Sequence, residues 1–530
     1  MTNNDIVQKL WNLCDVLRDD GINYSHYVTE LVLLLFIKME YENTQAGILD
    51  QHKLPEGCRW RDLTGKSGLT LLNDYKQMLL DLSQSDDRLI AAIYADAQTS
   101  LREPRHLEQL IKSLDAIDWF SAQKDGLGDL YEGLLEKNAN ETKSGAGQYF
   151  TPRALIDSII RCVKPQTGEI IQDPAAGTAG FLVAADAYMK SETDDYIDLP
   201  AKAAKFQKTE AFIGMELVPN TRRLALMNCL LHGMEGDDEG VVHLGNTLSD
   251  TGKTQLPKAD LILTNPPFGT AKGGGGPTRD DFTFKTSNKQ LAFLQHIYRS
   301  LKPGGRAAVV LPDNVLFEAG VGTEIRRDLM DKCNLHTILR LPTGIFYAQG
   351  VKTNVLFFTK GTAKKPKQEE NCTQNVWVYD LRSNMPSFGK RTLFGEQHLK
   401  PFEKAFGRKA DGTSKRTEGE WSFTNNSLSL EGEGRGEGEE QTEENSRWRS
   451  FSRDWIRDQK GDSLDIAWIK DEDSVDAKNL SEPEVLAAEA MGELTEALRE
   501  LDGLMRALGA GDEAEVQRQV LADSMGLTNG

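Results

Sequence analysis

One stretch decides the fold of this chain: Ile170-Ile171-Gln172-Asp173-Pro174-Ala175-Ala176-Gly177-Thr178-Ala179-Gly180-Phe181. A short apolar run, a turn of small residues and a helical start follow one another, which predicts a buried strand, a glycine-rich turn and a helix. Small side chains in such a turn let the backbone approach a ligand at the carboxyl end of a parallel strand. Ala179 stands where the dinucleotide-binding fingerprint has a glycine, so a pyrophosphate ligand is only weakly indicated.

Three further apolar runs behave as strands, at residues 211–216, 241–246 and 259–268, and residues 220–232 between them have helical periodicity. Alternating strands and helices predict an α/β fold with a Rossmann-like, doubly wound parallel sheet. Polar residues stand at the strand ends, namely Glu216, Asn246 and Asn265. Because open α/β sheets bind ligands at the carboxyl ends of their strands, we expect these residues and the glycine-rich turn to line one crevice.

The last of these strands ends in Asn265-Pro266-Pro267-Phe268. Neither proline has an N–H group, so neither continues a ladder of strand hydrogen bonds, and the result is a rigid loop. The Asn265 side-chain oxygen and the Pro266 carbonyl can accept the two N–H groups of a planar amine while Phe268 stacks on its ring. The simpler interpretation is an Asn-Pro turn after a strand.

Upstream of the sheet lies Gly147-Gln148-Tyr149-Phe150-Thr151-Pro152-Arg153. Thr151 is expected to cap a helix whose first residue is Pro152 and whose apolar face begins at Leu155. The N-terminus of that helix has free N–H groups and the positive end of the helix dipole, so it can receive a carboxylate.

The 530 residues are enough for two or three domains. Residues 1–137 are predicted to form a helical N-terminal domain, 138–362 the α/β domain and 363–475 an extension whose segment 431–444 is acidic and of low complexity. Residues 476–530 are expected to form a C-terminal helix. An a/d heptad seam indicates that this helix packs on its own domain or pairs with a partner helix: Ala487, Met491, Leu494, Leu498, Leu501, Met505 and Leu508.

Charge and cysteine usage limit the function. With a net charge of −19, the chain as a whole lacks the excess of basic residues that attracts DNA phosphates. If it acts on DNA, another subunit would need to supply much of the binding affinity. The six cysteines include no C-x-x-C pair, which argues against disulfides and zinc and favours a reducing cytoplasm. The longest apolar run, Leu31 to Ile37, is too short to span a membrane.

At the motifs GQYFTP, DPAAGTAGF and NPPF the sequence resembles the adenine-N6 DNA methyltransferases. It resembles most closely the modification subunit of type I restriction-modification systems, over most of the chain apart from the region around 431–444. The resemblance implies S-adenosylmethionine as the cofactor and no metal. Its methionine part would meet residues 148–153 and 178–180, its ribose Glu216 and its adenine Asn246. The full set of expected cofactor-binding residues is Gln148, Tyr149, Phe150, Thr151, Pro152, Arg153, Asp173, Gly177, Thr178, Ala179, Gly180, Glu216 and Asn246.

The resemblance also implies a complex of two modification subunits with one specificity subunit, which a restriction subunit joins for cleavage of double-stranded DNA. The target adenine must leave the duplex stack to reach the pocket. The expected catalytic residues are Asn265, Pro266, Pro267 and Phe268, which hold the adenine amine for methyl transfer.

Other functions fit the same loop. Cytosine N4, RNA bases and a glutamine side chain each present a planar NH₂ group, so an amino-methyltransferase acting on any of them is an alternative. A DNA-complex scaffold that keeps the fold without turnover is a second alternative.

Overall fold

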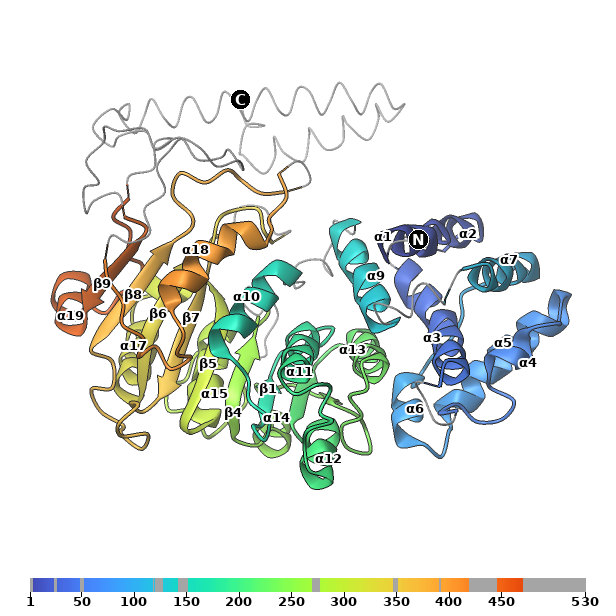
Figure 1. Ribbon diagram of the computed structural model, residues 1–530, viewed down its shortest axis with the longest axis horizontal. Coiled ribbons are helices and arrows are strands. Elements are labelled where there is room, and N and C mark those ends of the chain that lie inside the picture. The colour runs from blue at the N-terminus through green and yellow to red at the C-terminus, as the bar shows by residue number, and fades with distance from the viewer. Residues whose placement is uncertain are drawn as a thin grey trace, which may run out of the picture. The chain divides into compact units, whose positions relative to one another are not determined.

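A nine-stranded sheet forms the centre of the structure, a computed structural model (Figure 1). The structure describes residues 3–22, 26–47, 52–117, 119, 127–141, 151–268, 277–346, 351–389, 392–418 and 446–469. Three predicted features lie outside these residues: Gln148 to Phe150, the acidic segment 431–444 and the C-terminal helix. The chain divides into two units, Met1–Ile469 and Lys470–Gly530, and every described residue belongs to the first.

The strands are β1 (Ile171–Asp173), β2 (Phe212–Glu216), β3 (Val242–Leu244), β4 (Ala259–Thr264), β5 (Leu301–Pro312), β6 (Cys333–Arg340), β7 (Thr353–Lys360), β8 (Asn375–Asp380) and β9 (Trp448–Ser452). Their order in the sheet is β3-β2-β1-β4-β5-β7-β6-β8-β9. Strands β1 to β5 are parallel, whereas β7 runs antiparallel between β5 and β6. The doubly wound prediction is therefore confirmed, with β2 and β3 on one side of β1 and β4 on the other.

The sheet also includes strands from the C-terminal part of the described chain. β8 pairs in parallel with β6, and the edge strand β9 pairs antiparallel with β8. Both lie within residues 363–475, so this part of the chain extends the same sheet. Residues 302–305 lie inside β5, where the pairing with β4 shifts register.

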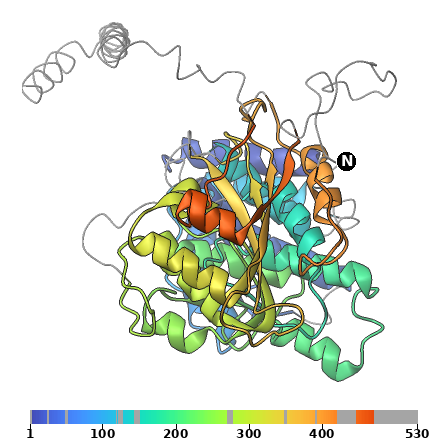
Figure 2. The same cartoon turned by 90° about the vertical axis from the view of Figure 1, so that its left-hand side faces the viewer.

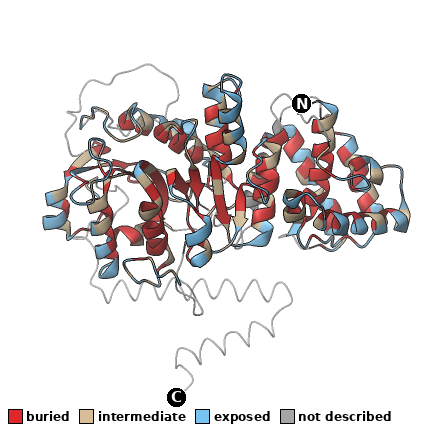
Figure 3. Cartoon of the chain, turned by 90° about the horizontal axis from the view of Figure 1, so that it is seen from below, coloured by how far each residue is buried: buried red, intermediate tan, exposed pale blue. Residues whose placement is uncertain are grey.

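Helices cover both faces of the sheet. They are α10 (Arg153–Val163), α11 (Gly180–Glu192), α12 (Ala201–Thr209), α13 (Pro219–Leu231), α14 (Asp250–Gln255), α15 (Lys289–Ser300), α16 (Asp313–Phe317), α17 (Val321–Lys332), α18 (Glu396–Phe406) and α19 (Arg453–Lys460). Helices α15 and α17 pack on one face and α10, α11 and α18 on the other (Figure 2). Strands buried between two helical layers carry continuous apolar runs, such as Ala307 to Leu311 in β5 (Figure 3).

The N-terminal part is helical, as predicted. Its helices are α1 (Asn3–Asn12), α2 (Cys14–Asp19), α3 (Tyr27–Gln45), α4 (Trp60–Leu63), α5 (Gly68–Ser83), α6 (Arg88–Ile93), α7 (Pro104–Asp115) and α9 (Leu127–Glu141). Helices α1 and α2 separate at Leu13, and α9 continues through residues 138–141, which were expected to begin the α/β domain. Helices α3, α6 and α9 pack on α13, and Arg223 of α13 donates through Nε to the carbonyl of Ile93 at 2.8 Å.

The six cysteines are free and buried. Within the part of the chain that the structure describes, no helix combines the length and the apolar character needed to cross a membrane.

Candidate functional site

The loop after β4 presents an unsatisfied acceptor. Asn265 is 7% exposed, and its Nδ2 donates to the Thr151 hydroxyl at 3.0 Å. Its Oδ1 is buried without a hydrogen-bond partner among the described residues. A buried carbonyl oxygen without a donor costs about 1–3 kcal/mol, so this atom is able to accept a hydrogen bond from an incoming N–H group. The structure therefore fixes the Asn265 amide with its acceptor free.

The aromatic residue of the loop has a partner that sequence reasoning missed. Phe268 is half-buried and meets buried Phe346 with ring centroids 6.0 Å apart and planes at 80°. This edge-on geometry is a favoured one for two aromatic rings. Phe346 comes from the segment between β6 and β7, and no motif in the sequence pointed to it. The Pro267 carbonyl accepts from Gln290 Nε2 at 3.4 Å.

The predicted cap of α10 is wrong. The helix begins at Arg153, and Pro152 is the N-cap residue with no side-chain cap. The Thr151 hydroxyl is used elsewhere, because it accepts the hydrogen bond from Asn265. Arg153 pairs with Glu132 and with Asp157, the latter at 3.1 Å. Thr151 thus connects the start of α10 to the end of β4.

The turn between β1 and α11 has open space beside it. Gly177 has φ +54°, and a Cβ added there would meet nothing within 4 Å. Ala179 adopts a left-handed φ of +67° and precedes the first residue of α11, Gly180. The Thr178 carbonyl accepts from Asn228 Nδ2 at 3.0 Å.

Asn228 also belongs to a second set of contacts. Its Nδ2 lies 3.2 Å from Glu132 Oε1, and Glu132 pairs with Arg153. These two residues link α9, α10 and the turn at Thr178. Sequence reasoning missed both, because Asn228 stood inside a helical pattern and Glu132 inside the last helix of the predicted N-terminal domain.

Two carboxylates lie against this turn. Glu216 Oε2 accepts from the backbone N–H of Gly177 at 3.0 Å, and its Oε1 accepts from that of Val218 at 2.8 Å. Burial raises the pKa of Glu216. Asp173 Oδ1 accepts from the backbone N–H of Ala175 at 3.0 Å, and burial raises the pKa of Asp173 to about 7.

The loop after β3 joins the same edge. Asn246 is exposed, and its Oδ1 accepts from the backbone N–H of Leu248 at 3.0 Å. The adjacent Thr247 hydroxyl donates to the carbonyl of Pro174. The ends of β1, β2 and β3 are therefore bonded to one another through Pro174 and Gly177, as the topology predicted.

Arg279, in the chain downstream of Phe268, is hydrogen-bonded to the loop after β3. Arg279 Nη1 donates to the Thr247 carbonyl at 3.2 Å and to His296 Nδ1 at 2.8 Å. The other ring nitrogen of His296 lies 3.0 Å from Gln172 Oε1 in β1. Burial holds the pKa of His296 down at about 3, so this ring is neutral and acts as a structural link.

Comparisons with known proteins agree with this fold. The profile described as N-6 DNA Methylase matches residues 122–428. The profile of the HsdM N-terminal domain matches residues 6–114, and a profile for the C-terminal domain of type I restriction enzyme methylase subunits matches residues 480–523. The fold and this family match define a DNA methyltransferase, and the chain belongs to the N-6 DNA methylase family.

Within this family it is a methylase subunit of the type I restriction-modification kind. It is 59% identical to the type I restriction enzyme StySPI methylase subunit of Salmonella potsdam and 58% identical to the EcoKI methylase subunit of Escherichia coli K12. Each alignment covers 99% of both chains. The crystal structure of the EcoKI M protein matches with a TM-score of 0.58 and 54% identity, over 99% of this chain and 100% of that one.

Proposed function

We propose that this site transfers a methyl group from S-adenosylmethionine to N6 of an adenine that has left the DNA duplex. The free Oδ1 of Asn265 carries the proposal, because a buried acceptor at the end of β4 suits an exocyclic amine. An amine lone pair is delocalised into the base, and acceptors on the two N–H groups turn it toward an electrophile. Asn265 Oδ1 and the Pro266 carbonyl are the proposed acceptors, and Phe268 the proposed stacking surface.

The crevice at the ends of β1, β2 and β3 fits the cofactor. S-adenosylmethionine supplies a methyl group on a positively charged sulfur. Space beside Gly177 leaves room for a ligand, and the nearby Glu216 and Asp173 carboxyls suit a cationic group or sugar hydroxyls. We assign Glu216 to the ribose, Asn246 to the adenine ring, and residues 148–153 and 178–180 to the methionine part. The chain positions and orients both reactants and needs no covalent intermediate.

The partners proposed for this chain rest on its net charge and on its family. A chain with a net charge of −19 has little electrostatic attraction to DNA on its own. We propose that two copies bind one specificity subunit, which selects the DNA site, and that a restriction subunit joins them. Six free, buried cysteines suit the reducing cytoplasm.

The test is transfer of a labelled methyl group from S-adenosylmethionine to duplex DNA, with and without the co-expressed specificity subunit. We expect transfer only in the presence of that subunit, and the label in N6-methyladenine after digestion to nucleosides. Label in N4-methylcytosine, RNA or protein would support an amino-methyltransferase of another substrate class. Cofactor binding without transfer to any of them would favour a scaffold.

A further inference from the structure

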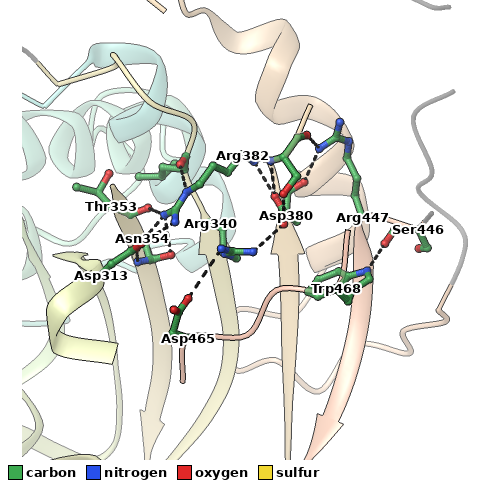
Figure 4. Close-up of polar contacts among 12 residues, drawn as sticks. Asp313, Arg340, Thr353, Asn354, Asp380, Arg382, Ser446, Arg447, Asp465 and Trp468 are labelled. Atoms are coloured by element: carbon green, nitrogen blue, oxygen red, sulfur yellow. Dashed lines mark hydrogen bonds and ion pairs between the residues drawn. The ribbon is translucent and has the colours of Figure 1, made fainter. Parts of the chain in front are cut away.

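A buried arginine holds the segment that brings Phe346 to Phe268. Arg382 follows β8, and its side chain is 7% exposed. Its Nη1 and Nη2 bind the Asp313 carboxylate at 2.8 and 3.0 Å, which is a two-pronged ion pair (Figure 4). The same guanidinium donates to the carbonyls of Thr353 at 2.7 Å and Leu341 at 3.0 Å.

These two carbonyls mark the two ends of the segment that carries Phe346. Leu341 directly follows β6, and Thr353 is the first residue of β7. Leu341 also donates its backbone N–H to the Thr353 carbonyl at 3.0 Å. Arg382 therefore closes the base of the segment, and Asp313 at the end of β5 joins it to the strand next to β4.

Asp380 fixes the backbone of Arg382 through hydrogen bonds. It is fully buried, and its Oδ1 accepts from the backbone N–H groups of Arg382 and Ser383, both at 2.8 Å. Its Oδ2 accepts from Arg340 Nη1 at 2.8 Å (Figure 4). Asp380 thus fixes the turn from which the Arg382 side chain projects.

A second anchor lies three residues before Phe346. Phe388 donates its backbone N–H to the Thr343 carbonyl at 3.0 Å. Gly344 has φ +82°, and a Cβ added there would lie 1.9 Å from the Phe388 carbonyl oxygen. The chain is thus tied down at Leu341 and Thr343, on the side of Phe346 that leads back to β6.

We propose that Arg382 is a positioning residue for methyl transfer, which acts by fixing Phe346 against Phe268. This inference rests on the proposed function, in which Phe268 stacks on the target adenine. The planar guanidinium makes two parallel bonds to a carboxylate and still reaches two carbonyls, whereas a lysine ammonium is a point charge that cannot reproduce this fork. Loss of the fork lets the segment shift, and the Phe268 ring loses its edge-on support.

The experiment compares Arg382→Lys with Arg306→Lys in the complex with the specificity subunit. Arg306 is the matched control, because it binds the Glu169 carboxylate with two prongs at 2.6 and 3.0 Å and donates to the Val163 carbonyl at 2.7 Å. Its contacts lie near the residues that precede β1, away from the strand ends that form the site. Thermal unfolding measures the structural cost of each variant, and we expect comparable costs.

Under single-turnover conditions we expect Arg382→Lys to slow methyl transfer by about 10- to 100-fold, a loss typical of small misplacements of a reacting group. The dissociation constant for S-adenosylmethionine should stay unchanged, because the cofactor crevice lies at β1 to β3. Arg306→Lys should transfer at the wild-type rate. Equal slowing in both variants would show a general structural effect and overturn the inference.

A double-mutant cycle with Phe346→Ala tests whether Arg382 affects methyl transfer through Phe346. If Arg382 acts through Phe346, Arg382→Lys causes little further slowing once the ring is gone. Additive losses would overturn the inference even if the proposed function holds. Failure of the wild-type complex to methylate adenine would instead overturn the proposed function itself.

Discussion

The side-chain amide of Asn265 donates a 3.0 Å hydrogen bond to the hydroxyl of Thr151, across 114 positions of the chain. In this arrangement Nδ2 donates to the Thr151 hydroxyl, and the amide oxygen points away from it. The opposite oxygen is left buried and without a donor among the described residues. Thr151 and Asn265 belong to two motifs with separate predicted roles. The hydrogen bond joins them and leaves the amide oxygen available as an acceptor.

Removal of the Asn265 amide should abolish most of the chemistry. We expect Asn265→Ala to lower the rate of methyl transfer by about 10²- to 10³-fold, as happens when a preorganised hydrogen-bonding group is deleted at a reacting centre. The single-turnover rate with labelled cofactor and DNA measures this loss. Cofactor affinity should be retained, and an unchanged rate would contradict the assignment.

The bond to Thr151 can be tested on its own. Thr151→Val keeps a similar shape but leaves the buried Asn265 Nδ2 without an acceptor, so we expect methyl transfer to fall by about 10-fold. Thr151→Ser restores a hydroxyl and should recover most of the rate. Equal activity of the valine and serine variants would mean that the hydrogen bond does not orient Asn265.

Cofactor binding should depend on the Glu216 charge. Glu216→Gln keeps the size of the side chain but weakens its bonds to hydroxyl groups, so the dissociation constant for S-adenosylmethionine should rise by about 10-fold. Titration calorimetry measures this constant. Glu210→Gln, which removes an exposed charge shortly before β2, is the control and should bind as the wild type does. Similar constants for all three proteins would exclude Glu216 from the cofactor site.

Asp173 should make stability depend on pH. Its pKa is about 7 in the folded protein against an ordinary value of 3.8, so the folded state holds a proton that the unfolded state has lost. The contribution of Asp173 to the free energy of unfolding therefore falls as the pH rises toward 7 and stays constant above pH 7. Relative to the wild type, Asp173→Asn should gain about 2 kcal/mol of unfolding free energy between pH 5.5 and pH 8. Urea titrations measure this gain, and parallel pH profiles would contradict the prediction.

Gly344 should tolerate no side chain. Its positive φ alone costs an alanine about 1–2 kcal/mol, and the collision with the Phe388 carbonyl adds to that cost. We expect Gly344→Ala to lower the free energy of unfolding by at least about 3 kcal/mol. Gly320 is the matched control, since it has φ +63° with nothing within 4 Å of an added Cβ. Equal costs for the two variants in urea unfolding would show that the Phe388 contact gives way easily.

The strands around the site and their parallel arrangement could be predicted because the signals for them are local. Apolar runs, small residues at 175–180 and polar residues at strand ends indicated where each strand stops, and parallel topology brings those ends to one edge. The same local reasoning failed at Thr151, because a good capping residue was claimed by a side chain far away in the sequence. Neither Phe346 nor Arg382 carried a local signal, since each acts through residues on other strands.

The sequence by itself determined the parallel α/β core, the turn at 174–180 and the identity of the Asn265 loop, because periodicity and backbone restriction act between near neighbours. Tertiary structure alone decided the direction of the Asn265 amide, the bond from Asn228 to the Thr178 carbonyl and the support of Phe268 by Phe346. Each of these is a contact between segments many residues apart. Such contacts exist only after the strands and helices have packed, so no local pattern encodes them.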